Sequence, residues 1–249
     1  MQKSAFHWCV IPMENRYIRQ IPLIGEDGCR KLADATVFIA GAGGLGSPVA
    51  YYLAASGIGH IRIADMDRVD TSNLNRQILH PESRIGENKA VSAKETLDAF
   101  NSECQIEAFT EKIDDASADK LIGDADLILD CLDNFEARYV LNRAALRLNT
   151  PLLHAAVSGY TGQLTLIIPG KTPCLSCIFP KAESVQSPPA LGAACGVVGS
   201  LQALEAVRYL TGNPTLAGKL LLYDGAANSI NTFSVKKSPR CRECGEESI

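Results

Sequence analysis

Short apolar runs alternate with longer amphipathic segments through the first 160 residues of the chain. The apolar runs at 36–40, 60–65, 105–109, 125–133 and 151–156 have the length and composition of strands. The segments at 47–56, 87–101 and 134–149 show helical spacing of apolar residues, and Pro48 falls in the first turn of the earliest, where proline is tolerated. Strands that alternate with helices predict βαβ units and a mainly parallel sheet.

The pattern changes in the second half. Residues 162–169 form another apolar strand pattern, and residues 181–196 are rich in proline and small side chains, which predicts a loop. A helix is predicted over 197–214, closed by Gly212 and Pro214. Residues 220–235 read as two antiparallel strands joined by a turn at DGAAN. No linker separates the halves, so we predict one domain over 1–249, with halves of about 1–160 and 161–249.

Composition narrows the class of protein. The chain has 249 residues, a net charge of -4 and 46% hydrophobic residues, and its sequence pI of about 5.6 argues against general affinity for nucleic acid or anionic membranes. No apolar run reaches the ~20 residues of a membrane span, and the N-terminus lacks the apolar stretch of a secretory signal. We therefore expect a cytoplasmic protein with no membrane or nucleic-acid partner.

A glycine-rich turn follows the first predicted strand. Gly41, Gly43 and Gly46 form G-x-G-x-x-G between a strand and a helix, a pattern that brings backbone N–H groups close to phosphate. Asp65 ends the next strand, where an acid can hold a ribose hydroxyl. These residues fit NAD as well as ATP, and the glycines could also serve helix–strand packing alone.

Polar and cationic residues follow the acid-tipped strand. The segment 71–89 carries Asn73, Arg76, Gln77 and Lys89 at the edge where ligands of open α/β sheets bind. Two cations near phosphates favour triphosphate chemistry over hydride transfer, although a solvated loop is the alternative. Asp133 ends the predicted strand at 125–133, and a carboxylate there suits Mg²⁺, while Asn134 is a good helix N-cap.

Four of the nine cysteines form two C-x-x-C pairs. Cys174, Cys177, Cys241 and Cys244 offer the ligand set of a structural, coordinatively closed Zn²⁺ site. Such a metal would tie the C-terminal tail to the end of the strand at 162–169. Unrelated thiols or redox pairs are the alternatives.

The motifs together resemble the E1-like activating enzymes of the ThiF/MoeB/HesA family. The matching stretches run in family order over nearly the whole chain: RYIRQ (16–20), GAGGLG (41–46), Asp65 with Asp67, SNLNRQ (72–77), Gly86 with Lys89, CLDN (131–134), GQLTLIIP (162–169), CLSC (174–177), GSLQALEA (199–206) and CRECG (241–245). The resemblance implies a Rossmann-like three-layer α/β fold whose mixed sheet is parallel in its N-terminal half and antiparallel in its C-terminal half. It also implies a homodimer that adenylates the C-terminal Gly-Gly carboxylate of a small ubiquitin-like sulfur-carrier protein.

The resemblance also implies a role for each matching residue. The expected catalytic residues are Arg76 and Lys89 as the main cations, Asp133 as the Mg²⁺ ligand, and Arg19 reaching the nucleotide of the partner subunit. The expected nucleotide-binding residues are Gly41, Gly43, Gly44, Gly46, Asp65, Asp67, Ser72, Asn73, Leu74, Asn75, Gln77 and Asn134. The expected cofactors are ATP, Mg²⁺ and structural Zn²⁺.

Adenylation needs no general base, because a C-terminal carboxylate with a reference pKa of ~3.3–3.7 is already ionised. This agrees with the position of all four histidines, His7, His60, His80 and His154, outside the matching motifs. Val185 stands near the position where many relatives carry a cysteine, and Cys195 reads as a small buried thiol. We therefore expect adenylation alone, with sulfur delivered by a separate donor protein, since the chain ends at Ile249 without a sulfurtransferase domain.

Two other functions fit part of this pattern. An NAD(P)-dependent oxidoreductase uses the same glycine turn and acid. A non-catalytic E1-like partner subunit would share the fold, but it would be free to lose Arg76, Lys89 and Asp133. The sequence names neither the carrier, whether for thiamine, molybdopterin or another product, nor the sulfur donor.

Overall fold

The structure is a computed structural model that describes residues 16–182 and 189–245. A single eight-stranded sheet of order β3-β2-β1-β4-β5-β6-β7-β8 runs through the described residues. The parallel strands are β1 (Thr36–Ala40), β2 (His60–Ala64), β3 (Gln105–Phe109), β4 (Leu127–Asp130) and β5 (Leu152–Ser158). From β5 onward, β6 (Thr161–Ile167), β7 (Lys219–Asp224) and β8 (Ser229–Ser234) pair antiparallel. The predicted mixed α/β fold is confirmed.

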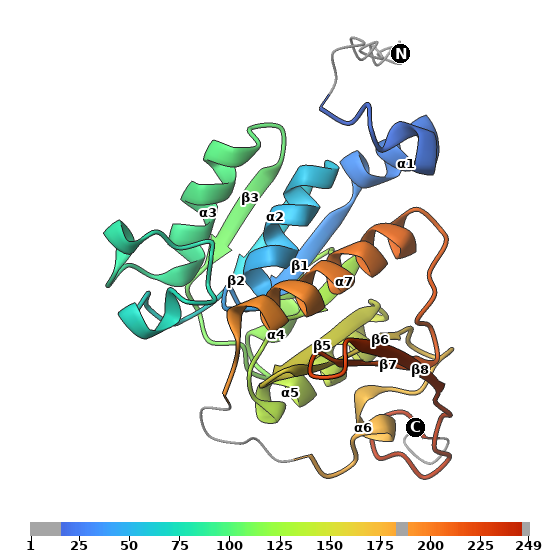
Figure 1. Ribbon diagram of the computed structural model, residues 1–249. Coiled ribbons are helices and arrows are strands. Elements are labelled where there is room, and N and C mark those ends of the chain that lie inside the picture. The colour runs from blue at the N-terminus through green and yellow to red at the C-terminus, as the bar shows by residue number, and fades with distance from the viewer. Residues whose placement is uncertain (1–15, 183–188, 246–249) are drawn as a thin grey trace.

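Helices cover both faces of the sheet (Figure 1). The first layer contains α1 (Ile21–Asp34), α2 (Gly46–Ser56), α3 (Lys89–Phe100) and α7 (Gly192–Leu210), and the second contains α4 (Ala118–Ile122), α5 (Phe135–Leu148) and the short α6 (Leu175–Ile178). Two 3₁₀ turns, η1 (Thr71–Asn73) and η2 (Glu82–Arg84), lie in the segment between β2 and α3.

Alternation along the central strands creates a separate core beneath each helical layer. In β1, Val37 and Ile39 belong to the core under α2 and α7, whereas Phe38 and Ala40 belong to the core under α4 and α5. Successive side chains of a strand point to opposite faces, and both faces here are covered, so the whole strand is apolar. This accounts for the continuous apolar runs in the sequence.

One predicted loop is partly wrong. Residues 192–196 were assigned to the loop 181–196, but they form the first turns of α7. An added Cβ at Gly192 would lie 2.3 Å from the Asn75 carbonyl oxygen. The small residues here therefore permit a close approach to the segment before Arg76, and this packing was not visible in local sequence. The other predicted helices and strands agree with the structure to within a few residues, and α1, α4 and α6 were not predicted.

Candidate active site

A cleft of about 530 Å³ opens at the carboxyl edge of the parallel strands. The strand order reverses between β1 and β4, since β2 and β3 lie on one side of β1 and β4 and β5 on the other. Ligands of open α/β sheets bind at such a switch point. Ten of the predicted site residues line the cleft: Gly41, Gly43, Gly44, Asp65, Asp67, Arg76, Gln77, Lys89, Asp133 and Asn134.

The glycine turn requires glycine at two positions for physical reasons. Gly41 has φ of +98°, and an added Cβ would lie 2.9 Å from the Cys131 carbonyl oxygen. An added Cβ at Gly46 would lie only 2.0 Å from the Gly41 carbonyl oxygen. The turn therefore packs backbone against backbone, which brings β1, α2 and the end of β4 together around the cleft. Gly46 serves this packing and does not itself line the cleft.

Both carboxylate oxygens of Asp65 accept backbone hydrogen bonds at the edge of the cleft, one of them from the glycine turn. Its Oδ2 accepts the Ala42 N–H at 2.8 Å, and its Oδ1 accepts the Asp67 N–H at 2.9 Å. Burial raises the pKa of the Asp65 carboxyl, and the nearby charge of Lys89 opposes this shift. Each carboxylate oxygen has a second lone pair, so Asp65 can still accept a hydroxyl from a ligand in the cleft.

The two predicted cations reach the cleft from different segments. Lys89 begins α3, its side chain is only 8% exposed, and its Nζ lies 3.0 Å from Asp67 Oδ2. The Arg76 guanidinium donates to the Ser72 carbonyl at 2.8 Å and to Asn75 Oδ1 at 2.9 Å. Both side chains line the cleft. They are therefore held beside any anion that binds there.

Asp133 and Asn134 lie directly after β4, at the opposite wall. The exposed Asp133 accepts the Asn134 side-chain N–H at 3.2 Å. Asn134 Oδ1 caps α5 by accepting the Ala137 N–H at 2.9 Å. Asn134 thus performs the structural role that its residue type predicts, and it presents Asp133 to the cleft.

Five further predicted residues lie outside the cleft lining, in two places. Ser72, Asn73, Leu74 and Asn75 belong to η1 and the turn after it. Asp70 caps this turn, accepting both the N–H and the hydroxyl of Ser72. Because Ser72 and Asn75 accept hydrogen bonds from the Arg76 guanidinium, this segment holds Arg76 in place from outside the cleft lining. Arg19 is exposed in the turn before α1, and its neighbour Gln20 is held at the far end of α2 by a 2.8 Å hydrogen bond to the Ser56 carbonyl.

Arg138 on α5 is a cleft residue that was not predicted from the sequence. It lines the cleft although it is only 5% exposed, and its Nη2 donates to the Leu132 carbonyl at 2.5 Å. Its Nε lies 3.7 Å from Asp130 Oδ2, and its guanidinium stacks 5.0 Å from the Phe135 ring centroid. A buried arginine five residues after Asp133 adds a third cation to the wall formed by the end of β4.

The loop after β3 was also missed. Glu111, Lys112, Ile113 and Asp114 line the cleft. The rule that ligands bind beyond the carboxyl ends of parallel strands would have included them, because β3 was predicted correctly.

Cys195 lies in the first turns of α7 and lines the cleft. It is 1% exposed, as the sequence predicted, and burial raises the pKa of its thiol while the charge of Arg76 opposes that shift. A protonated thiol is a poor nucleophile. Val185 lies outside the described residues.

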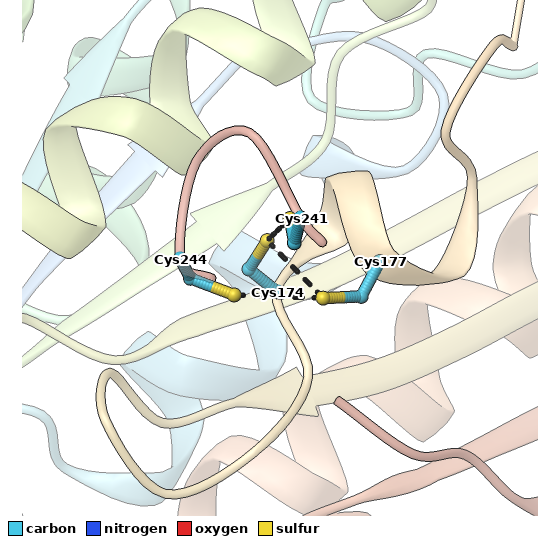
Figure 2. A group of neighbouring side chains, drawn as sticks. All are labelled: Cys174, Cys177, Cys241 and Cys244. Carbon is cyan, nitrogen blue, oxygen red and sulfur yellow. Dashed lines mark hydrogen bonds between the residues drawn. The ribbon is translucent and has the colours of Figure 1, made fainter. Parts of the chain in front are cut away.

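The four predicted zinc ligands come together. Figure 2 shows Cys174 and Cys177 at α6 facing Cys241 and Cys244 of the C-terminal turn. The Sγ–Sγ distances are 3.9 Å for Cys174–Cys177 and 3.5 Å for both Cys174–Cys241 and Cys177–Cys244. Tetrahedral zinc with Zn–S bonds of ~2.3 Å holds its sulfurs about 3.8 Å apart, so the donor set fits this ion.

Neighbouring groups also contact the four cysteines. The Ser238 N–H points at Cys177 Sγ at 3.4 Å, and burial raises the pKa of the Cys174 thiol. Bound metal would displace these thiol protons. The cluster lies apart from the cleft lining, which agrees with a structural role.

Comparison with known proteins gives the class to which this site belongs. The model of the ThiF family matches residues 15–243, and the chain belongs to that family. It is 39% identical over 247 residues to a sulfur carrier protein adenylyltransferase of Thermus thermophilus, covering 94% of this chain and 91% of that protein.

The chain is also similar to a longer relative and to a solved structure. The chain is 40% identical over 248 residues to the adenylyltransferase and sulfurtransferase MOCS3 of Drosophila sechellia, covering 94% of this chain and 54% of that protein. It therefore spans about half the length of this relative. The solved structure of E. coli MccB with ATP superposes with a TM-score of 0.84 at 27% identity, covering 93% of this chain and 74% of that one.

Proposed function

We propose that this chain uses ATP to adenylate the C-terminal Gly-Gly carboxylate of a small ubiquitin-like sulfur-carrier protein, releasing diphosphate. The adenylyltransferase class rests on family membership and on relatives of about 40% identity. The observation that carries the proposal is the convergence of Arg76, Lys89 and Asp133 on one cleft beside the glycine turn.

The reaction joins two anions, the carrier carboxylate and ATP, and the cations of the cleft reduce the repulsion between them. A carrier carboxylate oxygen attacks the α-phosphorus of ATP, and the bond from that phosphorus to the bridging oxygen of the β-phosphate breaks. The electron pair leaves with diphosphate, and no proton moves because the carboxylate is already ionised. Arg76, Lys89 and Arg138 offset the repulsion between carboxylate and triphosphate at fixed positions, which costs no reorganisation during the reaction.

Asp133 is the residue proposed to hold Mg²⁺. Its carboxylate is exposed at the cleft, and Mg²⁺ in such sites takes one or two carboxylates together with phosphate oxygens and water. The ion would supply further neutralisation of phosphate charge. Zn²⁺ is proposed for the four-cysteine cluster on the distances given above.

An open sheet face is proposed to receive the carrier. Leu221 of β7 belongs to the core under α7, so its neighbours Leu220 and Leu222 point to the opposite face. Phe233 of β8 pairs with Leu220 and shares that face. Phe233 is 52% and Leu222 38% exposed. An apolar strip of this kind suits the surface of a small protein partner.

A second copy of the chain is proposed to complete the site. Arg19 does not line the cleft of its own chain, and the adjacent Gln20 is held at the end of α2 remote from the glycine turn. In a homodimer Arg19 could approach the nucleotide of the partner subunit. A cytoplasmic location and a separate sulfur-donor protein complete the proposal. In the part of the chain that the structure describes, no helix has the length and apolar character to cross a bilayer.

The rival functions predict different ligands. An oxidoreductase would be stabilised by NAD, whereas this proposal expects ATP to raise the melting temperature by mass action. A non-catalytic subunit has no need of the three converging residues, and all three are present at the cleft.

Substitution of the cations tests the proposed function. Arg76→Ala and Lys89→Ala should each slow carrier-dependent ATP–diphosphate exchange by roughly 10²- to 10³-fold, the usual cost of losing one preorganised transition-state contact. Lys94→Ala is the matched control, because Lys94 lies on the same helix as Lys89 but pairs with Asp98 away from the cleft. Exchange at the wild-type rate in both cation variants would refute the assignment.

A further inference from the structure

His80 is a buried side chain that the proposed chemistry does not use, and it touches the glycine turn. It is 4% exposed, its Nε2 lies 2.8 Å from the Ala42 carbonyl oxygen, and its Nδ1 lies 2.9 Å from Ser92 Oγ. Ala42 belongs to the turn itself, and Ser92 belongs to α3, the helix that begins with Lys89. His80 therefore joins two parts of the site.

The hydrogen bonds define the protonation state of the ring. A carbonyl oxygen can only accept, so Nε2 must carry the proton that it donates to Ala42. In a neutral ring protonated at Nε2, Nδ1 accepts the Ser92 hydroxyl proton. Burial lowers the pKa of His80, and the charges of Lys89 and Arg84 lower it further, which keeps the ring in this form.

This contact determines where the next N–H points. The Ala42 N–H is held by Asp65 Oδ2 at 2.8 Å, and its carbonyl is held by His80. In a trans peptide the carbonyl of one residue and the N–H of the next point in opposite directions. The Gly43 N–H is therefore turned away from His80. Gly43 lines the cleft, and no described residue accepts a hydrogen bond from its N–H.

We propose that His80 is a positioning residue that orients the Ala42–Gly43 peptide, so that the Gly43 N–H is offered to a phosphate oxygen in the cleft. The inference rests on the proposed use of ATP. The Leu79 N–H also bonds to Ser47 Oγ at 3.3 Å, and Ser47 Oγ in turn donates to the Gly43 carbonyl at 2.7 Å. Residues 79 and 80 thus hold the carbonyls of both Ala42 and Gly43, His80 directly and Leu79 through Ser47 Oγ.

Two substitutions at His80 separate this role from simple packing. His80→Phe fills the space without donating to Ala42. We expect this variant to bind ATP more weakly and to lower kcat/KM for exchange by up to roughly 100-fold, which is the loss expected when a binding group is displaced by about 1 Å. His80→Gln has an amide nitrogen at a similar reach, so it should recover most of the loss.

Thr96→Val is the matched control. Thr96 Oγ1 lies 2.8 Å from the Leu79 carbonyl oxygen and 3.0 Å from the Ser92 carbonyl oxygen, next to His80, and its single proton goes to one of these carbonyls, not to Ala42. This variant should lose stability while ATP affinity stays close to wild type. The inference is wrong if His80→Phe binds ATP as wild type does, or if Thr96→Val loses as much affinity as His80→Phe.

NMR of the wild-type chain tests the inference even if His80→Phe does not fold. The ¹⁵N spectrum should show a neutral His80 ring protonated at Nε2, and the Gly43 amide should shift when a non-hydrolysable ATP analogue is added without carrier. A ring protonated at Nδ1, or an unmoved Gly43 amide in the ATP-saturated protein, would overturn it. Because neither readout needs a carrier, failure of the carrier proposal would be seen separately, as absent diphosphate exchange in the wild type.

Discussion

At the residue scale, two buried polar side chains, Asp130 at the end of β4 and His154, lie directly behind the cleft. His154 Nδ1 is 2.7 Å from Asp130 Oδ2, and both side chains are fully buried. Nδ1 donates to the carboxylate, and Nε2, 3.1 Å from Gln163 Nε2, accepts the amide N–H. Asp130 Oδ1 also accepts the Leu132 N–H at 3.1 Å. The group thus supports the chain that leads to Asp133 and the guanidinium of Arg138.

This arrangement predicts a pH dependence of stability. Burial lowers the pKa of His154, more than the charge of Asp130 raises it. The unfolded chain, with a histidine pKa of about 6.5, therefore binds this proton first as the pH falls, and the free energy of unfolding decreases below about pH 6.5. His154→Asn keeps a donor at the Nδ1 position but cannot titrate, so it should remove up to roughly 1.4 kcal/mol per pH unit from that slope.

Urea unfolding at several pH values from 7 to 5 would measure the slope in wild type and variant. The variant should be less stable at pH 7 because the smaller side chain leaves a cavity, but its dependence on pH should be shallower. An identical slope in the two proteins would contradict a neutral, buried His154.

At the element scale, α7 lies close against α2 because glycine stands at their crossing. A Cβ added to Gly199 would lie 2.5 Å from Pro48 Cγ and 2.9 Å from the Leu45 carbonyl oxygen. The same helix brings Cys195 to the cleft and Gln202 to the end of β4, where its amide donates to the carbonyls of Asp130 and Leu153. Close contact between these helices therefore sets one wall of the site.

The prediction is that Gly199→Ala destabilises the fold by about 1–3 kcal/mol, because the added methyl forces α7 away from α2. Gly196→Ala on the same helix is the control, since nothing lies within 4 Å of its added Cβ. Alanine favours helix over glycine by up to about 1 kcal/mol, so the control should be neutral or slightly stabilising. Thermal unfolding of the two variants would compare them, and equal effects would show that packing at Gly199 is unimportant.

At the scale of the whole molecule, the cysteine cluster brings together segments that are far apart in the sequence. Cys174 and Cys241 are 67 positions apart, and their sulfurs lie 3.5 Å from each other. Cys174 and Cys241 belong to the core under α5, so the proposed metal would fix the C-terminal turn against the second helical layer. The assignment of 1–249 to one domain with a division near residue 160 stays a prediction, although one sheet runs through both halves.

Metal analysis of the purified protein should find about one zinc per chain. Cys241→Ser should release it and lower the melting temperature by roughly 5–10 °C, corresponding to a few kcal/mol in a chain of this size. The rise in melting temperature caused by ATP should remain, because the cluster lies outside the cleft. Cys29→Ser, a half-buried thiol of α1, is the control and should keep the metal. A wild-type protein without stoichiometric metal would contradict the assignment.

The relatives confirm the adenylyltransferase class and the family predicted from the motifs. The motifs were sufficient because glycine turns, strand-end acids and paired cysteines are local patterns with a defined chemistry. Arg138 was missed because a single arginine on an amphipathic helix has the same local pattern whether it faces solvent or a cleft. His80 was set aside because it lies outside every motif, and only its contact with Ala42 reveals a link to the site.

The order of polar and apolar residues along this chain was enough to determine most of its strands and helices, the glycine turn and the two cysteine pairs that come together. These depend on interactions between residues a few positions apart, which the sequence displays directly. Only the tertiary structure decided that β4 returns to pair with β1, that α7 begins at Gly192, and that His154 meets Asp130 behind the cleft. Those contacts depend on which surfaces bury one another across long separations, and no local pattern encodes that choice.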